Sequence, residues 1–254
     1  MLTYEQLGNN GRLGNQMFQY AALRAAGIKL ELPIKIPNGD YNLLKFDINK
    51  EFLSNNDIIE STYNEKCFHF CNDIFNIKDN TDIVGFLQSY KYFDFIRDIL
   101  LEEFNNKNLE ILYNDIIGKV KLRYNKQIVS IHVRRGDYFL YPNIHPVCTK
   151  KYYKTCMDCF DGCVFLVFSD DIEWCKSNIK ANYIEYVQYD ENIDLILMSK
   201  CDHNIISNSS FSWWAAWLNK NENKIIKYPN IWFGKDGPQD TFDLIPNSWN
   251  IVEC

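Results

Sequence analysis

The segment His132-Val-Arg-Arg-Gly-Asp-Tyr138 carries the strongest signal for chemistry, because two adjacent arginines follow a hydrophobic run. A guanidinium group offers a planar fork of N–H donors that suits a phosphate. Side chains alternate along a strand, so Arg134 would share a face with His132 while Arg135 points the opposite way. The segment therefore predicts one functional and one structural arginine. A buried salt bridge between an arginine and Asp137 that closes the turn is the alternative interpretation.

Two further segments place small polar residues directly after predicted strands. Phe168-Ser-Asp-Asp171 opens a predicted helix, so its residues are candidate helix N-caps as well as candidate contacts to a nucleotide. Ser207-Asn-Ser-Ser-Phe-Ser-Trp-Trp214 places hydroxyl groups at a helix N-terminus, where free N–H groups and the helix dipole favour a phosphate. No Asp-x-Asp pair occurs in the chain, which disfavours a metal-dependent sugar-nucleotide enzyme.

A glycine-rich turn, Gly8-Asn-Asn-Gly-Arg-Leu-Gly14, lies between a predicted strand at 2–7 and a predicted helix at 16–26. Asn15 is its candidate N-cap, and Gly27 is expected to end the helix. The glycine spacing differs from that of dinucleotide-binding folds, and the chain has no P-loop. A tight turn before a capped helix explains the segment as well as a ligand-binding loop does.

Nine cysteines raise the question of a metal site or of disulfides. Cys156, Cys159 and Cys163 could form a zinc site with Cys148 or Cys175, but they also share one face of a predicted helix. Core packing is the favoured interpretation, with all the thiols reduced. We therefore predict no metal ligands in this chain.

Charge and hydropathy exclude several classes of protein. The net charge of −6 and the isoelectric point of about 5.3 do not suit a nucleic-acid-binding protein, which needs a basic surface. No apolar run is long enough to span a bilayer, and the first residues do not resemble a signal peptide. We expect a cytoplasmic protein without a transmembrane segment. Peripheral contact with a membrane is compatible with this expectation. The oligomeric state is not predicted.

The second half, residues 126–254, alternates strands with short helices, which predicts a doubly wound parallel sheet with helices on both faces. The predicted strands are 128–133, 164–168, 183–189, 204–207 and 224–228. The predicted helices are 150–160, 171–179, 193–201 and 211–219, and the tail beyond 229 is expected to be irregular, with Trp232 and Trp249 packing it down.

The first half, residues 1–125, is harder to interpret. Residues 31–80 show no clear periodicity, and residues 89–104 predict an aromatic-rich helix. A lysine-rich stretch at 118–127 is the expected boundary between the halves. Two α/β halves predict a ligand-binding cleft between them.

Taken together, these segments resemble the α-1,2-fucosyltransferases of glycosyltransferase family 11. The most specific blocks are residues 11–21, 132–138 and 207–214, with Gly85-Phe-Leu-Gln-Ser-Tyr-Lys-Tyr-Phe93 and 168–171 in the same order. The resemblance implies a GT-B-like fold whose C-terminal half binds GDP-fucose. It also implies a β-galactoside acceptor, inversion at the fucose anomeric carbon and no required metal.

The resemblance also implies roles for individual residues. Arg134 would bind the GDP phosphates, with His132 beside it. The other implied donor contacts are Ser169 and Asp170 to the nucleoside, Asp194 to the guanine edge, Ser209, Ser210 and Phe211 around the phosphate, and Asn15 facing the fucose and the acceptor. Arg12 stands where the family often has glycine. An inverting displacement needs a proton acceptor, for which Asp137 is the first candidate and His145 the second.

Three other functions compete with this one. A related fucosyltransferase of α-1,6 or protein O-linked specificity would share the His-x-Arg-Arg arrangement, but the Ser-Trp-Trp block disfavours it. A catalytically inactive sugar-binding module would not need to keep Arg134, Ser209 and Ser210. An adhesion protein that uses Arg135-Gly-Asp137 would need export and a mobile loop, and the sequence indicates neither.

Overall fold

A computed structural model describes residues 1–54 and 58–254 and divides them into two compact units. The first unit contains residues 1–107 and a returning segment, 240–247, and the second contains 108–239 and 248–254. The chain passes between them at Lys107, earlier than the boundary expected at 125. The lysine-rich stretch at 118–127, which was expected to contain the boundary between the halves, lies mostly in helix α3 (Glu110–Tyr124). That helix buries Tyr113, Ile117 and Val120 on one face, so its lysines are the solvated face of a helix.

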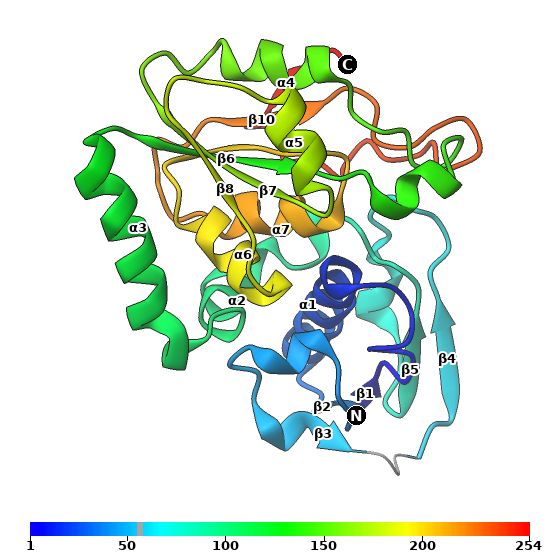
Figure 1. Cartoon of the computed structure of the whole chain (residues 1–254). Helices are drawn as coiled ribbons and strands as arrows, with labels where there is room; N and C mark the ends of the chain where they lie inside the picture. Colours follow the sequence, from blue (N-terminus) through cyan, green and yellow to red (C-terminus); the bar gives the residue numbers. More distant parts are fainter. Residues whose placement is uncertain (55–57) are drawn as a thin grey trace. The chain divides into compact units, whose positions relative to one another are not determined.

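The first unit is built on a parallel sheet with strand order β3-β2-β1-β5-β4 (Figure 1). Leu2 of the central strand pairs with Ile34 on one side and Thr81 on the other. The strands are β1 (Leu2–Thr3), β2 (Ile34–Pro37), β3 (Leu53–Ser54), β4 (Ser61–Asn64) and β5 (Thr81–Val84). They are short, which explains why residues 31–80 show no strand periodicity and why the first strand ends before residue 7.

Helix α1 (Leu13–Leu30) is longer than expected at both ends. Arg12, not Asn15, occupies the N-cap position, and its side chain makes no capping bond. Gly27 does not end the helix: it is buried inside it, and a Cβ there would overlap the side chain of Ile34. The glycine therefore permits close approach of β2, and Glu31 ends the helix in the left-handed conformation. Among the described residues, no helix is both long and apolar enough to cross a membrane.

The aromatic segment at 89–104 is not one helix. It contains two short 3-10 turns, η4 (Tyr90–Tyr92) and η5 (Asp94–Ile96), and only then α2 (Arg97–Glu103). Tyr92 and Phe93 are fully buried at the breaks between these turns. Burial of aromatic rings outweighs the helical pattern there.

The second unit is a six-stranded sheet of order β11-β10-β9-β6-β7-β8, and every recorded pair is parallel. The strands are β6 (Ile128–Val133), β7 (Val164–Ser169), β8 (Ile184–Val187), β9 (His203–Ile205), β10 (Ile226–Pro229) and β11 (Asn250–Val252). The helices that follow them are α4 (Lys150–Met157), α5 (Ile172–Asn178), α6 (Glu191–Ser199) and α7 (Ser210–Leu218). The alternating pattern is confirmed, and β11 is the one strand in this unit that was not predicted.

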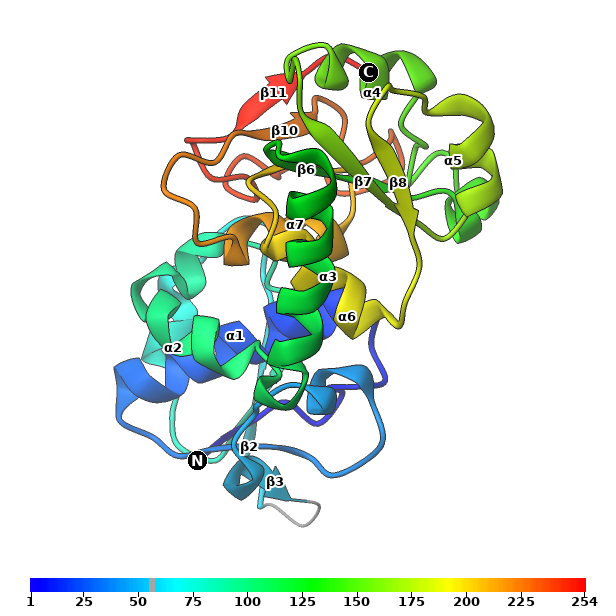
Figure 2. The same cartoon turned by 60° about the vertical axis from the view of Figure 1, so that its left-hand side comes forward.

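Helices cover both faces of this sheet. Helices α4 and α5 lie on one side and α6 and α7 on the other (Figure 1). Helix α3 lies beside α6 (Figure 2), where Lys200 Nζ pairs with Glu110 Oε1 at 2.7 Å. The doubly wound arrangement is therefore confirmed, and two units with all-parallel sheets agree with the predicted α/β class.

The cysteines are free thiols, and most lie in the core. Cys148, Cys156, Cys163 and Cys175 belong to one buried cluster under α4 and α5. Cys159 is exposed, because α4 ends at Met157 before the predicted helical face is complete. Core packing is thus confirmed for Cys156 and Cys163 and wrong for Cys159. The tail is also packed down as predicted, since Trp232 and Trp249 are each only 8% exposed.

Candidate active site at the strand ends of the second unit

The carboxyl ends of β6, β7 and β9 meet at one edge of the second sheet. The register pairs Val133 with Ser169 on one side and Ile131 with Ile205 on the other. The polar segments that follow these strands therefore lie together, although they are far apart in sequence. We call this group the strand-end site; it contains Arg134, Asp137, Ser169, Asp170 and residues 207–211.

Arg134 is held between two carboxylates. Its Nη1 lies 2.9 Å from Asp170 Oδ2, and its Nη2 pairs with Asp137 Oδ1. The guanidinium also lies over the ring of Tyr138, 5.3 Å from the centroid, and the side chain is 15% exposed. Gly136 makes this arrangement possible, because a Cβ there would lie about 2.5 Å from Asp170 Oδ2. The guanidinium is thus fixed in direction, with much of its charge already balanced.

Asp137 lies in the turn beside the arginine that the sequence suggested as its partner. The carboxylate is about one-third exposed and pairs with Arg134 three residues before it. The structure therefore contains the predicted turn-closing salt bridge. A role for Asp137 as the catalytic base stays a prediction.

Arg135 occupies a different environment from its neighbour. Its guanidinium stacks on Trp174, 3.9 Å from the ring centroid, and its Nε donates to Asp171 Oδ2 at 3.0 Å. Its backbone N–H donates to Asp170 Oδ1 at 2.9 Å. The side chain therefore joins the end of β6 to the start of α5, which agrees with a structural arginine. Trp174 gave no signal in the sequence, because an aromatic residue in a predicted helix is ordinarily core.

His132 is buried beneath the site and hydrogen-bonded to the next loop. Its Nδ1 lies 2.9 Å from Ser207 Oγ, and its ring lies 5.2 Å from that of Phe211. Burial, and then the positive charge of Arg134, lower the pKa of His132 to about 3. The imidazole is therefore neutral at physiological pH, so it can position Ser207 but cannot supply positive charge.

The loop before α7 is fixed by bonds from several directions. The Asn208 amide donates to the carbonyls of Pro146 and Trp232, at 2.8 and 3.0 Å. The Tyr138 hydroxyl donates to the carbonyl oxygen of Asn208 at 2.8 Å. Asn208 is only 2% exposed. Neither Tyr138 nor Asn208 was among the predicted site residues.

Helix α7 presents its N-terminus at the strand-end site. Ser209 holds the N-cap position in an extended conformation, and its hydroxyl makes no capping bond. Ser212 instead donates its hydroxyl to the carbonyl oxygens of Ser207 and Ser209, at 3.4 and 3.3 Å. Ser210 and Phe211 form the first turn and are half-buried. The backbone N–H groups of this turn are the ones that a helix leaves available to an anion.

Of the residues after β7, two cap helix α5 and one contacts Arg134 in the strand-end site. The hydroxyl of Ser169 accepts from the N–H of Asp171 at 2.9 Å, and Asp171 Oδ1 accepts from the N–H of Trp174 at 3.1 Å. These two residues therefore begin α5, as the capping interpretation predicts. Asp170 is the one that reaches Arg134.

Asp194 lies on α6, which follows β8. Its Oδ1 accepts from the N–H of Tyr189 at 3.1 Å. Burial raises the pKa of Asp194 to about 7, a bond from Tyr189 opposes this, and the charge of Asp190 adds to it. This carboxylate therefore titrates near neutral pH, which any role at a guanine edge must take into account.

His145 lies against the strand-end site. Its ring stacks on Tyr138 with the centroids 4.8 Å apart, and burial lowers its pKa. Its Nδ1 is buried and has no hydrogen-bond partner among the described residues. The charge of Asp137 opposes this lowering of the pKa, and the charge of Arg134 adds to it.

Asn15 belongs to the first unit. Its Oδ1 accepts from Gln88 Nε2 at 2.9 Å, which connects two of the sequence blocks that carry the family resemblance. Gly11, with a φ of 93°, packs directly against the Asn15 side chain. The glycine-rich turn thus fixes Asn15 rather than using it as a cap.

Comparison with known proteins adds evidence on the family to which the chain belongs. A model of glycosyl transferase family 11 matches residues 5–240. An alpha-1,2-colitosyltransferase of Escherichia coli is 29% identical over 96% of this chain and 97% of its own length. The O-antigen biosynthesis glycosyltransferase WbnK of Escherichia coli is 31% identical over 94% of this chain and 97% of its own length. Human galactoside alpha-(1,2)-fucosyltransferase 1 is 28% identical over 82% of this chain and 64% of the human protein.

Proposed function

Because the chain belongs to glycosyl transferase family 11, we propose that it transfers L-fucose from GDP-fucose to the 2-hydroxyl of a terminal β-galactoside. The proposal includes inversion at the anomeric carbon and no requirement for a metal. The observation that supports it most directly is the convergence of Arg134 and the N-terminus of α7 at one edge of the second sheet.

The chemistry needs positive groups where the glycosidic bond to GDP breaks. Negative charge grows on the leaving phosphate in the transition state, and fixed donors aimed at that charge lower the barrier. Arg134 supplies a guanidinium that Asp137 and Asp170 already orient. The first turn of α7 supplies backbone N–H groups and the positive end of the helix dipole. A diphosphate bound here would neutralise part of the Arg134 charge that the two carboxylates neutralise in its absence.

The acceptor hydroxyl must lose a proton as it attacks. Asp137 is the proposed base, because it is ionisable, partly exposed and adjacent to Arg134. His145 is the second candidate, since burial lowers its pKa, which favours the neutral imidazole, and its Nδ1 has no hydrogen-bond partner among the described residues. Either base stops working once it is protonated, so substitution of each residue, rather than the pH profile, separates the two assignments.

Colitose is a second candidate for the transferred sugar. The Escherichia coli alpha-1,2-colitosyltransferase covers nearly the whole chain at 29% identity. Colitose is fucose without its 3-hydroxyl group, so the same phosphate contacts serve both donors. A site that hydrogen-bonds the 3-hydroxyl would strongly prefer fucose, whereas one that does not would accept both sugars.

The test is release of GDP from GDP-fucose, with and without lactose, in excess EDTA. We expect release that depends on lactose, because lactose carries a terminal β-galactoside. GDP-colitose in a parallel reaction compares the two donors, and NMR of the product determines the linkage. An α-1,6 or protein O-linked enzyme would not form the 2-linked product.

If no GDP is released, a measurement of GDP binding by calorimetry in the same sample shows the reason. GDP binding without turnover would mean that lactose is the wrong acceptor. Failure to bind GDP would contradict the donor assignment and favour an inactive sugar-binding module. Loss of activity in EDTA that Mn²⁺ or Mg²⁺ restores would contradict metal independence.

A further inference from the structure

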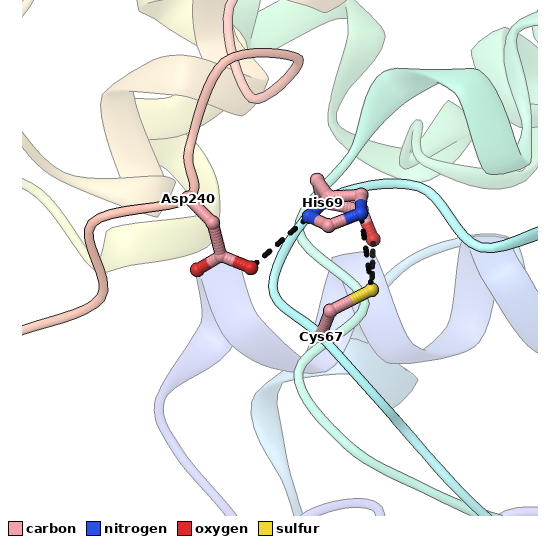
Figure 3. Close-up of side chains that lie close together, drawn as sticks. All are labelled: Cys67, His69 and Asp240. Carbon is pink, nitrogen blue, oxygen red and sulfur yellow. Dashed lines mark hydrogen bonds and ion pairs between the residues drawn. The ribbon is translucent and has the colours of Figure 1, made fainter.

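A separate group of chemically reactive side chains lies in the first unit. Cys67 and His69 belong to the loop after β4, and Asp240 joins them from the returning segment 240–247 (Figure 3). One ligand-type atom from each residue lies within 4.8 Å of the others. We call these three residues the cysteine–histidine cluster. The proposed transfer reaction uses none of them.

His69 lies between the thiol and the carboxylate. Its Nδ1 is 3.0 Å from Asp240 Oδ2, and its Nε2 is 3.3 Å from Cys67 Sγ. Because an ionised carboxylate only accepts hydrogen bonds, we assign the imidazole proton to Nδ1. Nε2 then presents its lone pair toward the sulfur, so two soft donor atoms face each other.

The spacing of these two atoms suits a zinc ion. Zinc bonds of about 2.3 Å to sulfur and about 2.0 Å to nitrogen, at a tetrahedral angle, place the two donor atoms roughly 3.5 Å apart. The separation of Cys67 Sγ and His69 Nε2 is 3.3 Å. Asp240 occupies the position of the carboxylate that commonly orients a zinc-bound histidine through its other nitrogen.

The loop is rigid before any ion binds. Tyr92 accepts from the N–H of Cys71 at 3.0 Å and donates to the carbonyl oxygen of His69 at 3.3 Å. Asp240 also accepts from the N–H of Phe68 at 3.0 Å. His69 is one-third exposed, so an ion can enter from solvent. A preformed and accessible arrangement lowers the cost of ordering the ligands.

We propose that Cys67 and His69 bind one Zn²⁺ ion, with Asp240 holding the histidine in place. Water would complete the tetrahedral coordination. The ion would stabilise the attachment of segment 240–247 to the loop after β4. Its effect is on stability and not on the transfer chemistry, so it is compatible with a reaction that needs no catalytic metal.

The order thiol, imidazole, carboxylate is also that of a nucleophilic cysteine. The separation of 3.3 Å between Cys67 Sγ and His69 Nε2 is compatible with both functions, so an experiment must separate them. Alkylation by iodoacetamide distinguishes the two. Zinc bound at this site would protect Cys67 from alkylation, whereas a nucleophilic cysteine that binds no zinc would react at the same rate with and without it.

The direct test is titration of metal-free, reduced full-length protein with Co²⁺, a spectroscopic substitute for zinc. We expect one equivalent to bind with the intense visible bands of tetrahedral cobalt and a thiolate charge-transfer band. Cys67→Ser and His69→Gln should each lose these bands and weaken binding at least about 100-fold. Asp240→Asn should keep them and weaken binding about 10- to 100-fold.

Cys159→Ser is the matched control, because Cys159 is an exposed thiol of the second unit. It should bind cobalt like the wild type. Zn²⁺ should raise the melting temperature of the wild type and of this control but not that of His69→Gln. Absence of a tetrahedral thiolate spectrum in the wild type would overturn the proposal, and so would its persistence in His69→Gln. Neither result bears on GDP binding, so this proposal and the proposed function fail independently.

Discussion

The strand-end site and the cysteine–histidine cluster differ in the charge of the groups that they offer to a ligand. At the strand-end site the chain supplies the cation, and Arg134 lies between Asp137 and Asp170. In the cluster it supplies a thiol, an imidazole and a carboxylate, which are all electron-pair donors. The first arrangement suits an incoming anion that displaces carboxylates, and the second suits an incoming cation. Local charge balance therefore indicates the class of ligand more directly than residue type does.

The strongest test of the strand-end site is Asp137→Asn, which removes the proposed base and keeps the shape of the side chain. We expect kcat to fall by about 10²- to 10⁴-fold, the range of general base catalysis, while GDP still binds. Circular dichroism and the GDP Kd check that the fold and the donor site survive. Full activity would move the role to His145, or to no side chain, and would leave Asp137 as a turn-closing residue.

Arg134→Ala should have the next largest effect. Loss of the guanidinium removes stabilisation of the leaving phosphate and leaves Asp137 and Asp170 beside the anion. We expect kcat/KM to fall by an amount equivalent to about 2–4 kcal/mol. Steady-state kinetics with GDP-fucose and lactose measure it. A near-normal kcat/KM would refute the assigned role.

Arg135→Ala is the matched comparison, because the two arginines are adjacent and equally buried. Its side chain stacks on Trp174 and pairs with Asp171, whereas that of Arg134 pairs with Asp137 and Asp170. We expect the free energy of unfolding to fall by roughly 1–3 kcal/mol, from loss of the stacking and the ion pair. Urea denaturation measures this. If Arg135→Ala reduces kcat/KM as much as Arg134→Ala does, the division into a functional and a structural arginine is wrong.

The two sites also differ in how well the sequence predicts them. The strand-end site was predictable because parallel strands bring consecutive β-α junctions to one edge, so short polar segments after apolar runs mark it. His69 and Asp240 are 171 residues apart and lie outside any regular element. Only the sequence Cys67-Phe-His-Phe-Cys71 could have suggested a metal site there.

The same contrast holds for the fold. Strand β6 is buried along its whole length and was predicted with its observed ends. Strand β1 has only two residues, which is too short for any periodicity. Gly27 shows a third kind of failure: it resembles a helix stop, yet a neighbouring strand requires it inside α1. Long-range packing, which local patterns do not contain, decides such positions.

The smallest expected effect concerns Asp194 and depends on pH. Its pKa is about 7 in the folded protein and about 3.9 when unfolded, so the unfolded state loses this proton first. The stability gained from the protonated carboxyl is full below pH ~4 and is lost as the pH rises through ~7. Above that pH, Asp194→Asn should stabilise the protein by roughly 1–3 kcal/mol, and by much less at pH 4.

Urea denaturation at pH 4.5 and at pH 8 measures this difference. Asp236→Asn is the control, because Asp236 is an exposed carboxylate of the same unit that lies outside α6. It should show little change at either pH. The pH dependence also sharpens the proposed guanine contact. A carboxylate that accepts from guanine must be ionised, so the affinity for guanosine, which has no phosphate that titrates in this range, should rise between pH 6 and pH 8. In Asp194→Asn that rise should disappear, and a rise that persists would place the guanine contact on another residue.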